Sequence, residues 1–176
     1  MDDGGTPGRL LIIGGGQDRC CGAGLLERFV ELCGGGSARI VLVTTATGRP
    51  DQEHADYERV FRKLGVDQTI QLRLHGRADA DGDAAAAVLT DATGVFFTGG
   101  DQSRLRTLVG SRANDLLRER LSQGLIVGGT SAGATASSNM SSVTRASSAT
   151  TVGSDSPSPY TGVEPLAISK RTAPTE

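Results

Sequence analysis

Short apolar runs that end in glycine-rich turns recur along this chain of 176 residues. The runs are rich in β-branched residues, and segments with helical periodicity lie between them, a pattern that predicts buried strands joined by crossover helices. Such connections are right-handed and produce a parallel sheet. The predicted fold class is therefore α/β, an open parallel sheet with helices on both faces.

The expected elements follow the chain in order. Strands are predicted at residues 9–13, 38–45, 68–74, 95–98 and 125–127. Helices are predicted at residues 25–33, 51–64, 83–89, 102–108 and 114–121. Asp51 and Asn114 are the expected N-terminal caps, and Gly65 the residue that ends the second helix.

One domain is expected, because the chain is too short for two comfortable cores. Residues 1–8 are predicted to form a flexible lead and residues 9–140 the α/β domain. Residues 141–176 are rich in Ser, Thr and Pro and lack apolar periodicity, which predicts a disordered tail after the last strand.

Charge and cysteine content exclude several function classes. The formal net charge of -2 provides no basic field for nucleic acid or for an anionic membrane. The first apolar run, Leu10–Ile13, is too short for a signal peptide or a membrane span, so we expect a cytoplasmic protein. Cys20, Cys21 and Cys33 lack a metal-ligand spacing, so no metal and no cofactor are predicted.

The segment Gly129-Thr130-Ser131-Ala132-Gly133 follows the last apolar run and fits the G-x-S-x-G nucleophile elbow. A serine on a sharp strand-to-helix turn has strained backbone angles, and side chains two positions before and after it would collide. The turn would expose the Ser131 hydroxyl and leave the Ala132 N–H at a helix N-terminus, where it can stabilise an oxyanion. The alternative is a glycine-rich turn in which Ser131 only caps the helix.

A second glycine turn, Gly99-Gly100-Asp101-Gln102, follows the apolar run at residues 95–98. The carboxyl ends of parallel strands lie at one edge of the sheet, so this turn and Ser131 are expected to share one crevice. The glycine N–H groups would complete the oxyanion hole, and Gln102 would hold a substrate amide or carboxylate.

A third turn, Gly14-Gly15-Gly16-Gln17-Asp18, invites comparison with dinucleotide-binding loops. The G-x-G-x-x-G pattern requires glycine where Arg19 stands, and the chain has no Walker lysine motif. A nucleotide-binding module therefore remains an alternative that rests on the glycine turns alone.

Taken together, the three turns in this order and spacing resemble the cyanophycinase and dipeptidase E family over about residues 9–140. The resemblance implies a class I glutamine amidotransferase-like fold, a serine-type hydrolase and a homodimer. It also implies a peptide substrate, the β-aspartyl-arginine units of cyanophycin. By the same resemblance Ser131 is the nucleophile, the N–H groups of Ala132 and of Gly99 or Gly100 are the oxyanion donors, and Asp101 and Gln102 bind substrate.

The sequence departs from the family at the general base. The family has a downstream Asp-Gln-His segment, whereas the two histidines here, His54 and His75, both precede Ser131. A serine hydroxyl needs a base within hydrogen-bond reach to act as a nucleophile at neutral pH. His75 is the candidate stand-in, because it follows the third predicted strand at the same edge, whereas His54 is expected to be solvated. In the first turn, Gln17 stands where the family often has glutamate.

These departures leave several functions open. We expect the chain to be a truncated or frame-shifted relative of the family. It is either a serine-type hydrolase that acts through Ser131 or a non-catalytic binding protein that keeps the pocket. Among enzymes, an aspartyl dipeptidase is the alternative to a cyanophycinase.

Overall fold

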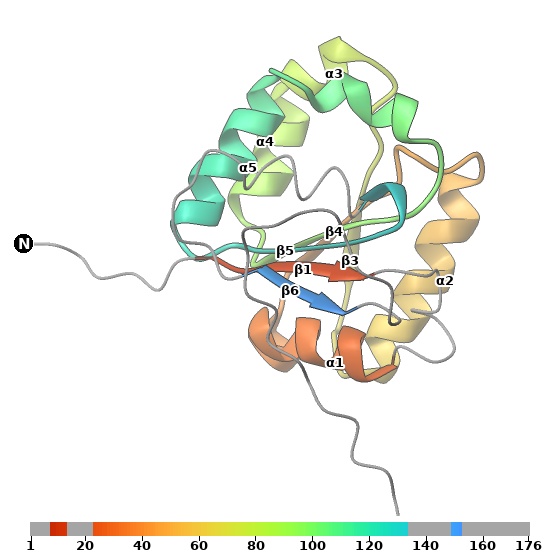
Figure 1. The fold of residues 1–176 in the computed structure, drawn as a ribbon, viewed down its shortest axis with the longest axis vertical. Coiled ribbons are helices and arrows are strands. Elements are labelled where there is room, and N and C mark those ends of the chain that lie inside the picture. The colour runs from red at the N-terminus through yellow and green to blue at the C-terminus, as the bar shows by residue number, and fades with distance from the viewer. Residues whose placement is uncertain (1–7, 14–22, 134–148, 153–176) are drawn as a thin grey trace, which may run out of the picture.

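The computed structural model describes residues 8–13, 23–133 and 149–152 and contains a parallel sheet with the strand order β3-β2-β4-β5-β1-β6 (Figure 1). The strands are β1 (Leu10–Ile13), β2 (Ile40–Val43), β3 (Thr69–Leu72), β4 (Gly94–Phe97), β5 (Ile126–Thr130) and β6 (Ala149–Val152). The helices are α1 (Ala23–Leu32), α2 (Pro50–Lys63), α3 (Arg77–Asp81), α4 (Asp83–Thr90) and α5 (Arg112–Ser122), with 3₁₀ helices η1 (Gly35–Ser37) and η2 (Gln102–Leu108). The predicted fold class is confirmed.

The sheet separates two apolar cores, because successive side chains of a strand point to opposite faces. On β2, Val41 and Val43 belong to the core beneath α4 and α5, whereas Ile40 and Leu42 belong to the core beneath α1 and α2. All four side chains are at most 1% exposed. Burial on both faces explains the continuous apolar runs in the sequence. Figure 1 shows the two helix layers on either side of the sheet.

Aromatic side chains fill the core on the α1 and α2 side. Phe96 of β4 lies with its ring centroid 5.4 Å from that of Phe29, 5.2 Å from that of Tyr57 and 5.8 Å from that of Phe61. The four side chains are fully buried. Phe96 is thus at the centre of this cluster and ties β4 to both helices.

Two helix starts differ from the expected ones. Helix α2 begins at Pro50, and Asp51 lies in its first turn rather than at the cap. Proline suits this position because its fixed φ is helical and the first N–H needs no intrahelical partner. Helix α5 is capped by the buried Ser111, whose Oγ accepts the Asn114 N–H at 3.2 Å, so Asn114 is not the cap. Gly65 has a φ of +90° at the end of α2, as predicted.

Besides the three-residue 3₁₀ helix η1, two elements were not predicted. Helix α3 occupies five residues that are too few to show a helical periodicity. Strand β6 pairs in parallel with β1, in register from Leu10 and Ala149. It lies within the range 141–176, so the turn at Ser131 follows the fifth of six strands rather than the last. The β-branched residues of β6 favour extended backbone even though the segment has little apolar periodicity.

Within the described ranges, none of the helices combines the length and the hydropathy that crossing a membrane requires. In the same part of the chain, no cluster of three or more His, Cys, Asp or Glu side chains could hold a metal ion.

Candidate active site

The turns after β4 and β5 lie side by side. The two strands are neighbours, paired from Gly94 with Ile126 to Phe97 with Gly129. A β-carbon built on Gly99 would lie 3.5 Å from the β-carbon of Ser131. The expected meeting of the Gly99-Gly100 turn with Ser131 is therefore present in the structure, at the carboxyl edge of the sheet.

Ser131 has strained backbone angles. Its φ of +53° is the one positive value at a non-glycine position in the described part of the chain. L-residues other than glycine adopt this left-handed region at a cost, so the surrounding fold must enforce it. Ser131 is exposed, between the buried residues Thr130 and Ala132. This geometry is typical of a nucleophile elbow and leaves Ser131 exposed beside the Gly99-Gly100 turn.

Close backbone contacts explain the glycines around this turn. A β-carbon on Gly133 would lie 2.3 Å from the carbonyl oxygen of Phe97, and one on Gly100 would lie 2.2 Å from that of Ala46. Gly100 also has a φ of +141°, which side chains disfavour. Glycine at these positions allows the backbone at residue 133 to contact β4 and allows the turn after β4 to contact the turn after β2.

Three backbone N–H groups in the turns at Gly99 and Ser131 have no acceptor in the described part of the chain. The N–H of Thr98 donates to the Val43 carbonyl at 3.1 Å, and the N–H of Asp101 donates to the Ala46 carbonyl at 2.8 Å. Between them, the N–H groups of Gly99 and Gly100 have no acceptor among the described residues, and neither has that of Ala132. Backbone donors that converge beside an exposed serine can stabilise an oxyanion.

Asp101 and Gln102 begin the 3₁₀ helix η2. The Asp101 carboxylate caps this helix by accepting the Ser103 N–H at 2.8 Å. Hydrogen bonds from Ser103, followed by the nearby Arg104 charge, hold the pKa of Asp101 below its usual value. Gln102 is exposed at the same rim. Asp101 therefore has a structural task here, and Gln102 is the more available of the two for a ligand.

Neither histidine contacts Ser131 in the described part of the chain. The His54 Nε2 lies 3.3 Å from the Thr69 Oγ, at the amino end of β3, so His54 is partly buried rather than solvated as expected. His75 is exposed, and its backbone N–H donates to the Asp79 carboxylate at 2.7 Å. It follows β3, which β2 and β4 separate from β5. Three strand spacings amount to about 14 Å, more than an imidazole side chain can bridge.

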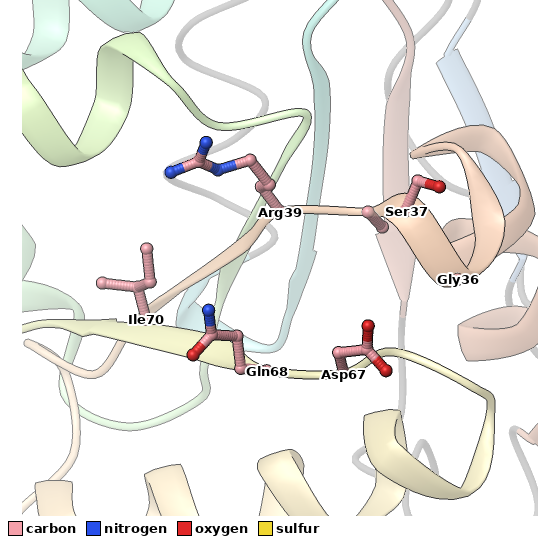
Figure 2. Close-up of a pocket in the computed structure, with 7 residues that line it drawn as sticks. Gly36, Ser37, Arg39, Asp67, Gln68 and Ile70 are labelled. Carbon is pink, nitrogen blue, oxygen red and sulfur yellow. The ribbon is translucent and has the colours of Figure 1, made fainter.

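A cavity of about 320 Å³ lies at the amino ends of β2 and β3, opposite the strand ends that carry Ser131 (Figure 2). Its lining comes from the segments that precede β2 and β3 and from the start of β3: Gly36, Ser37, Ala38, Arg39, Asp67, Gln68 and Ile70. Because these segments lie at the amino ends of their strands, the cavity is separate from the crevice at Ser131.

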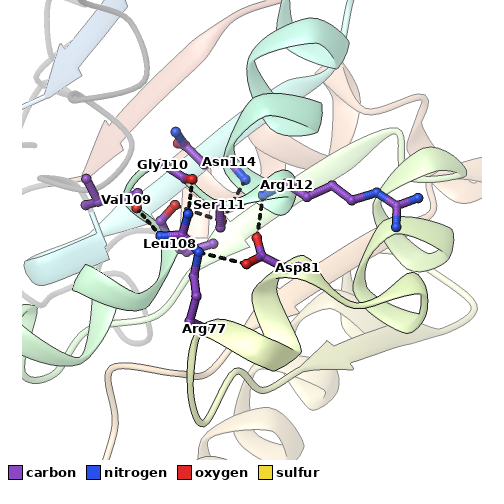
Figure 3. Close-up of polar contacts among 8 residues, drawn as sticks. All are labelled: Arg77, Asp81, Leu108, Val109, Gly110, Ser111, Arg112 and Asn114. Carbon is purple, nitrogen blue, oxygen red and sulfur yellow. Dashed lines mark hydrogen bonds and ion pairs between the residues drawn. The ribbon is translucent and has the colours of Figure 1, made fainter.

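An arginine clamp holds the far end of η2 (Figure 3). The Arg77 guanidinium donates to the carbonyls of Val109 and Gly110, at 2.8 Å for Val109, and to Asp81 at 2.8 Å. Asp81 also accepts the Arg112 N–H at 2.9 Å. These contacts join α3 to the turn between η2 and α5. Sequence reasoning missed the clamp, since its contacts between α3 and the turn before α5 join residues more than 30 positions apart.

The clamp predicts a pH-dependent contribution of Asp81 to stability. The Arg112 N–H, followed by the Arg77 guanidinium, lowers the pKa of Asp81. A lowered folded-state pKa stabilises the protein above the ordinary aspartate value of about 3.9, and this contribution disappears as the pH falls through the folded-state value. Asp81→Asn should therefore lower Tm at pH 7, and the difference from the unmodified protein should shrink as the pH falls below about 4.

Asp91→Asn is the matched control for this measurement. Asp91 pairs with Arg39 at 3.5 Å, with both side chains more than half exposed. Exposed pairs of this kind contribute little to stability. Thermal melts of both variants at pH 7 and pH 3 test the clamp, and an equal response of the two variants would contradict it.

The remaining features singled out in the sequence are the three cysteines and three segments of the chain. Cys33 is buried, and burial raises the pKa of its thiol, so Cys33 is no nucleophile at neutral pH. Cys20, Cys21 and the turn at residues 14–18 lie outside the described residues, as do residues 1–7 and most of the predicted tail.

Comparisons with known proteins show the family to which the chain belongs. Residues 10–164 match peptidase family S51. The cyanophycinase of Synechococcus elongatus is 37% identical over 132 residues, which are 74% of this chain and 41% of that protein. The cyanophycinase of Trichormus variabilis is 33% identical over 131 residues, 73% of this chain and 44% of that protein.

A solved structure shows the same fold. The crystal structure of a peptidase from an acI-B1 actinobacterium superposes with a TM-score of 0.59 at 24% identity, over 72% of this chain and 55% of that one. The chain spans less than half the length of the curated relatives it matches.

Proposed function

Because the chain belongs to peptidase family S51, we propose that Ser131 is the nucleophile of a cyanophycinase-like serine hydrolase. The observation that carries the proposal is the strained, exposed Ser131, with a φ of +53°, beside the Gly99-Gly100 turn. Ser131 Oγ attacks the scissile carbonyl carbon, and its proton passes through a base to the leaving amine. Water then hydrolyses the acyl-enzyme.

The oxyanion that forms in each step faces backbone donors. The N–H groups of Gly99, Gly100 and Ala132 have no acceptor in the described part of the chain and lie around Ser131. Each such donor contributes on the order of 3 kcal/mol to stabilisation of the transition state. The 3₁₀ start at Gln102 places an exposed amide at the same rim, where it can bind a substrate amide or carboxylate.

The proposed substrate is a β-aspartyl-arginine unit of cyanophycin. The relatives named cyanophycinase, at 37% and 33% identity, support this class, and the Gly-Gly-Asp-Gln version of the second turn favours it over an aspartyl dipeptide. A thermal shift measurement with β-aspartyl-arginine and with an α-aspartyl dipeptide discriminates the two, because a ligand stabilises the protein in proportion to its occupancy.

Labelling by a fluorophosphonate probe tests the nucleophile. We expect covalent labelling of Ser131 in the unmodified protein and background labelling in Ser131→Ala, because alanine has no hydroxyl to phosphonylate. Peptide mass mapping after digestion locates the adduct. Ser131→Gly serves as the control for folding. It should also fail to label but should raise the free energy of unfolding by about 1 kcal/mol, because glycine tolerates the left-handed φ.

A second candidate is a non-catalytic binding protein of the same family. It is favoured by one observation, that His54 and His75 are both held away from Ser131 in the described structure. Loss of the base from a serine triad reduces turnover by about a millionfold. Absence of labelling in a folded protein that β-aspartyl-arginine still stabilises would support this candidate and overturn the hydrolase.

A further inference from the structure

Buried threonines end three of the parallel strands. Those that follow β2 and β4, namely Thr44, Thr45 and Thr98, each use the side-chain hydroxyl to bind a neighbouring strand or turn. Their partners are Gln71 Nε2 for Thr44 at 3.1 Å, the Leu74 N–H for Thr45 at 3.0 Å and the Val43 carbonyl for Thr98 at 3.2 Å. Hydroxyl groups at this edge of the sheet are thus part of its hydrogen-bonding scheme.

Thr130, at the end of β5, is the exception. Its side chain is 4% exposed, and its Oγ has no hydrogen-bond partner among the described residues. A buried hydroxyl without a partner destabilises a folded protein, because it has lost its bonds to water and gained none in return. A valine of the same shape would avoid this cost.

Thr130 lies directly against the turn that carries the proposed oxyanion donors. A β-carbon built on Gly99 would be 3.8 Å from the Thr130 carbonyl oxygen and 3.9 Å from its γ-methyl group. On this turn the N–H groups of Gly99 and Gly100 also lack acceptors in the described part of the chain. The Thr130 residue, with its buried hydroxyl, therefore packs beside Ser131 against the turn whose N–H groups lack described acceptors.

We propose that Thr130 is a positioning residue for the Gly99-Gly100 turn, and this inference rests on the function proposed above. In the free protein its hydroxyl has no partner among the residues that the structure describes. When a tetrahedral adduct forms on Ser131, the N–H groups of the turn bind the oxyanion, and the Thr130 hydroxyl donates a hydrogen bond to a backbone carbonyl of the same turn. The new hydrogen bond stabilises the tetrahedral adduct and is absent from the free protein. It therefore accelerates the reaction at Ser131 without adding to the stability of the fold.

The variants Thr130→Val and Thr130→Ser test this assignment through two readouts, Tm and the rate of Ser131 phosphonylation. Thr130→Val should melt at or above the temperature of the unmodified protein, because no existing hydrogen bond is lost. Its maximal phosphonylation rate should fall roughly tenfold, the effect of one hydrogen bond, with the half-saturating probe concentration little changed. Thr130→Ser keeps the hydroxyl and should react within about threefold of the unmodified rate.

Thr45→Val is the matched control for stability. It leaves the Leu74 N–H without its acceptor and should lower Tm. If Thr130→Val lowers Tm as much as Thr45→Val does, its hydroxyl already has a partner and the assignment is wrong. Labelling of Thr130→Val at the unmodified rate would overturn it as well. A folded unmodified protein that does not label at all overturns the proposed function, and this assignment with it.

Discussion

Gly133→Ala should destabilise the protein by about 3 kcal/mol or more and abolish labelling of Ser131. The added β-carbon would lie 2.3 Å from the Phe97 carbonyl oxygen and 2.7 Å from the Phe97 β-carbon. Because the nearest atom belongs to the backbone of a central strand, no side-chain rotation relieves the clash. The helix after Ser131 must move away from β4, and the strained turn that exposes the serine then loses its support.

The control is Gly24→Ala in the exposed part of α1, where a β-carbon meets nothing within 4 Å. Alanine has the higher helix propensity, so this variant should gain about 0.5–1 kcal/mol. Urea denaturation followed by circular dichroism measures both changes. A Gly133→Ala variant as stable as the unmodified protein would mean that the helix can shift freely, and the elbow would then not depend on this contact.

Phe96→Ala should lower the free energy of unfolding by about 3–5 kcal/mol. Phe96 is fully buried and contacts the rings of Phe29, Tyr57 and Phe61, so truncation leaves a cavity that two helices and a central strand cannot easily close. The urea midpoint should fall with the slope unchanged, which identifies a change in stability rather than in the surface exposed on unfolding.

Val109→Ala is the control for this variant. Val109 is 70% exposed, so its truncation should change the free energy of unfolding by less than about 0.5 kcal/mol. Equal midpoints for the two variants would show that the aromatic cluster contributes little, and that the fold depends mainly on the core on the α4 and α5 side.

Local chemistry explains what could be predicted from the sequence. The strand runs are apolar because both faces of the sheet are covered, and this burial produces the pattern that identifies them. The glycines at positions 100 and 133 allow backbone contacts that no side chain permits, so G-x-S-x-G already implied a strained serine at position 131. Short segments of the sequence therefore sufficed to predict the fold class, the strained turn at Ser131 and a helix that begins at Gln102.

The expectations that failed depended on choices between similar local signals. Asp51 and Asn114 are good capping residues. However, α2 already begins at Pro50, and Ser111 is the N-cap of α5. His75 follows the carboxyl end of β3, as expected. However, β3 is the outermost strand of the sheet, and β2 and β4 lie between it and β5, which leads to Ser131. A sequence pattern identifies a strand without stating which strands will be its neighbours, so the distance from His75 to Ser131 was not accessible.

By itself, then, the sequence determined strands β1 to β5 and the left-handed serine, because each depends on residues a few positions apart. Tertiary structure alone decided the strand order, which places the Gly99-Gly100 turn beside Ser131 and removes both histidines from it. It also decided the arginine clamp at Asp81 and the burial of the Thr130 hydroxyl, which has no partner among the described residues. The physical reason is that burial and long-range pairing depend on the whole packed sheet and leave no periodic trace in any one segment.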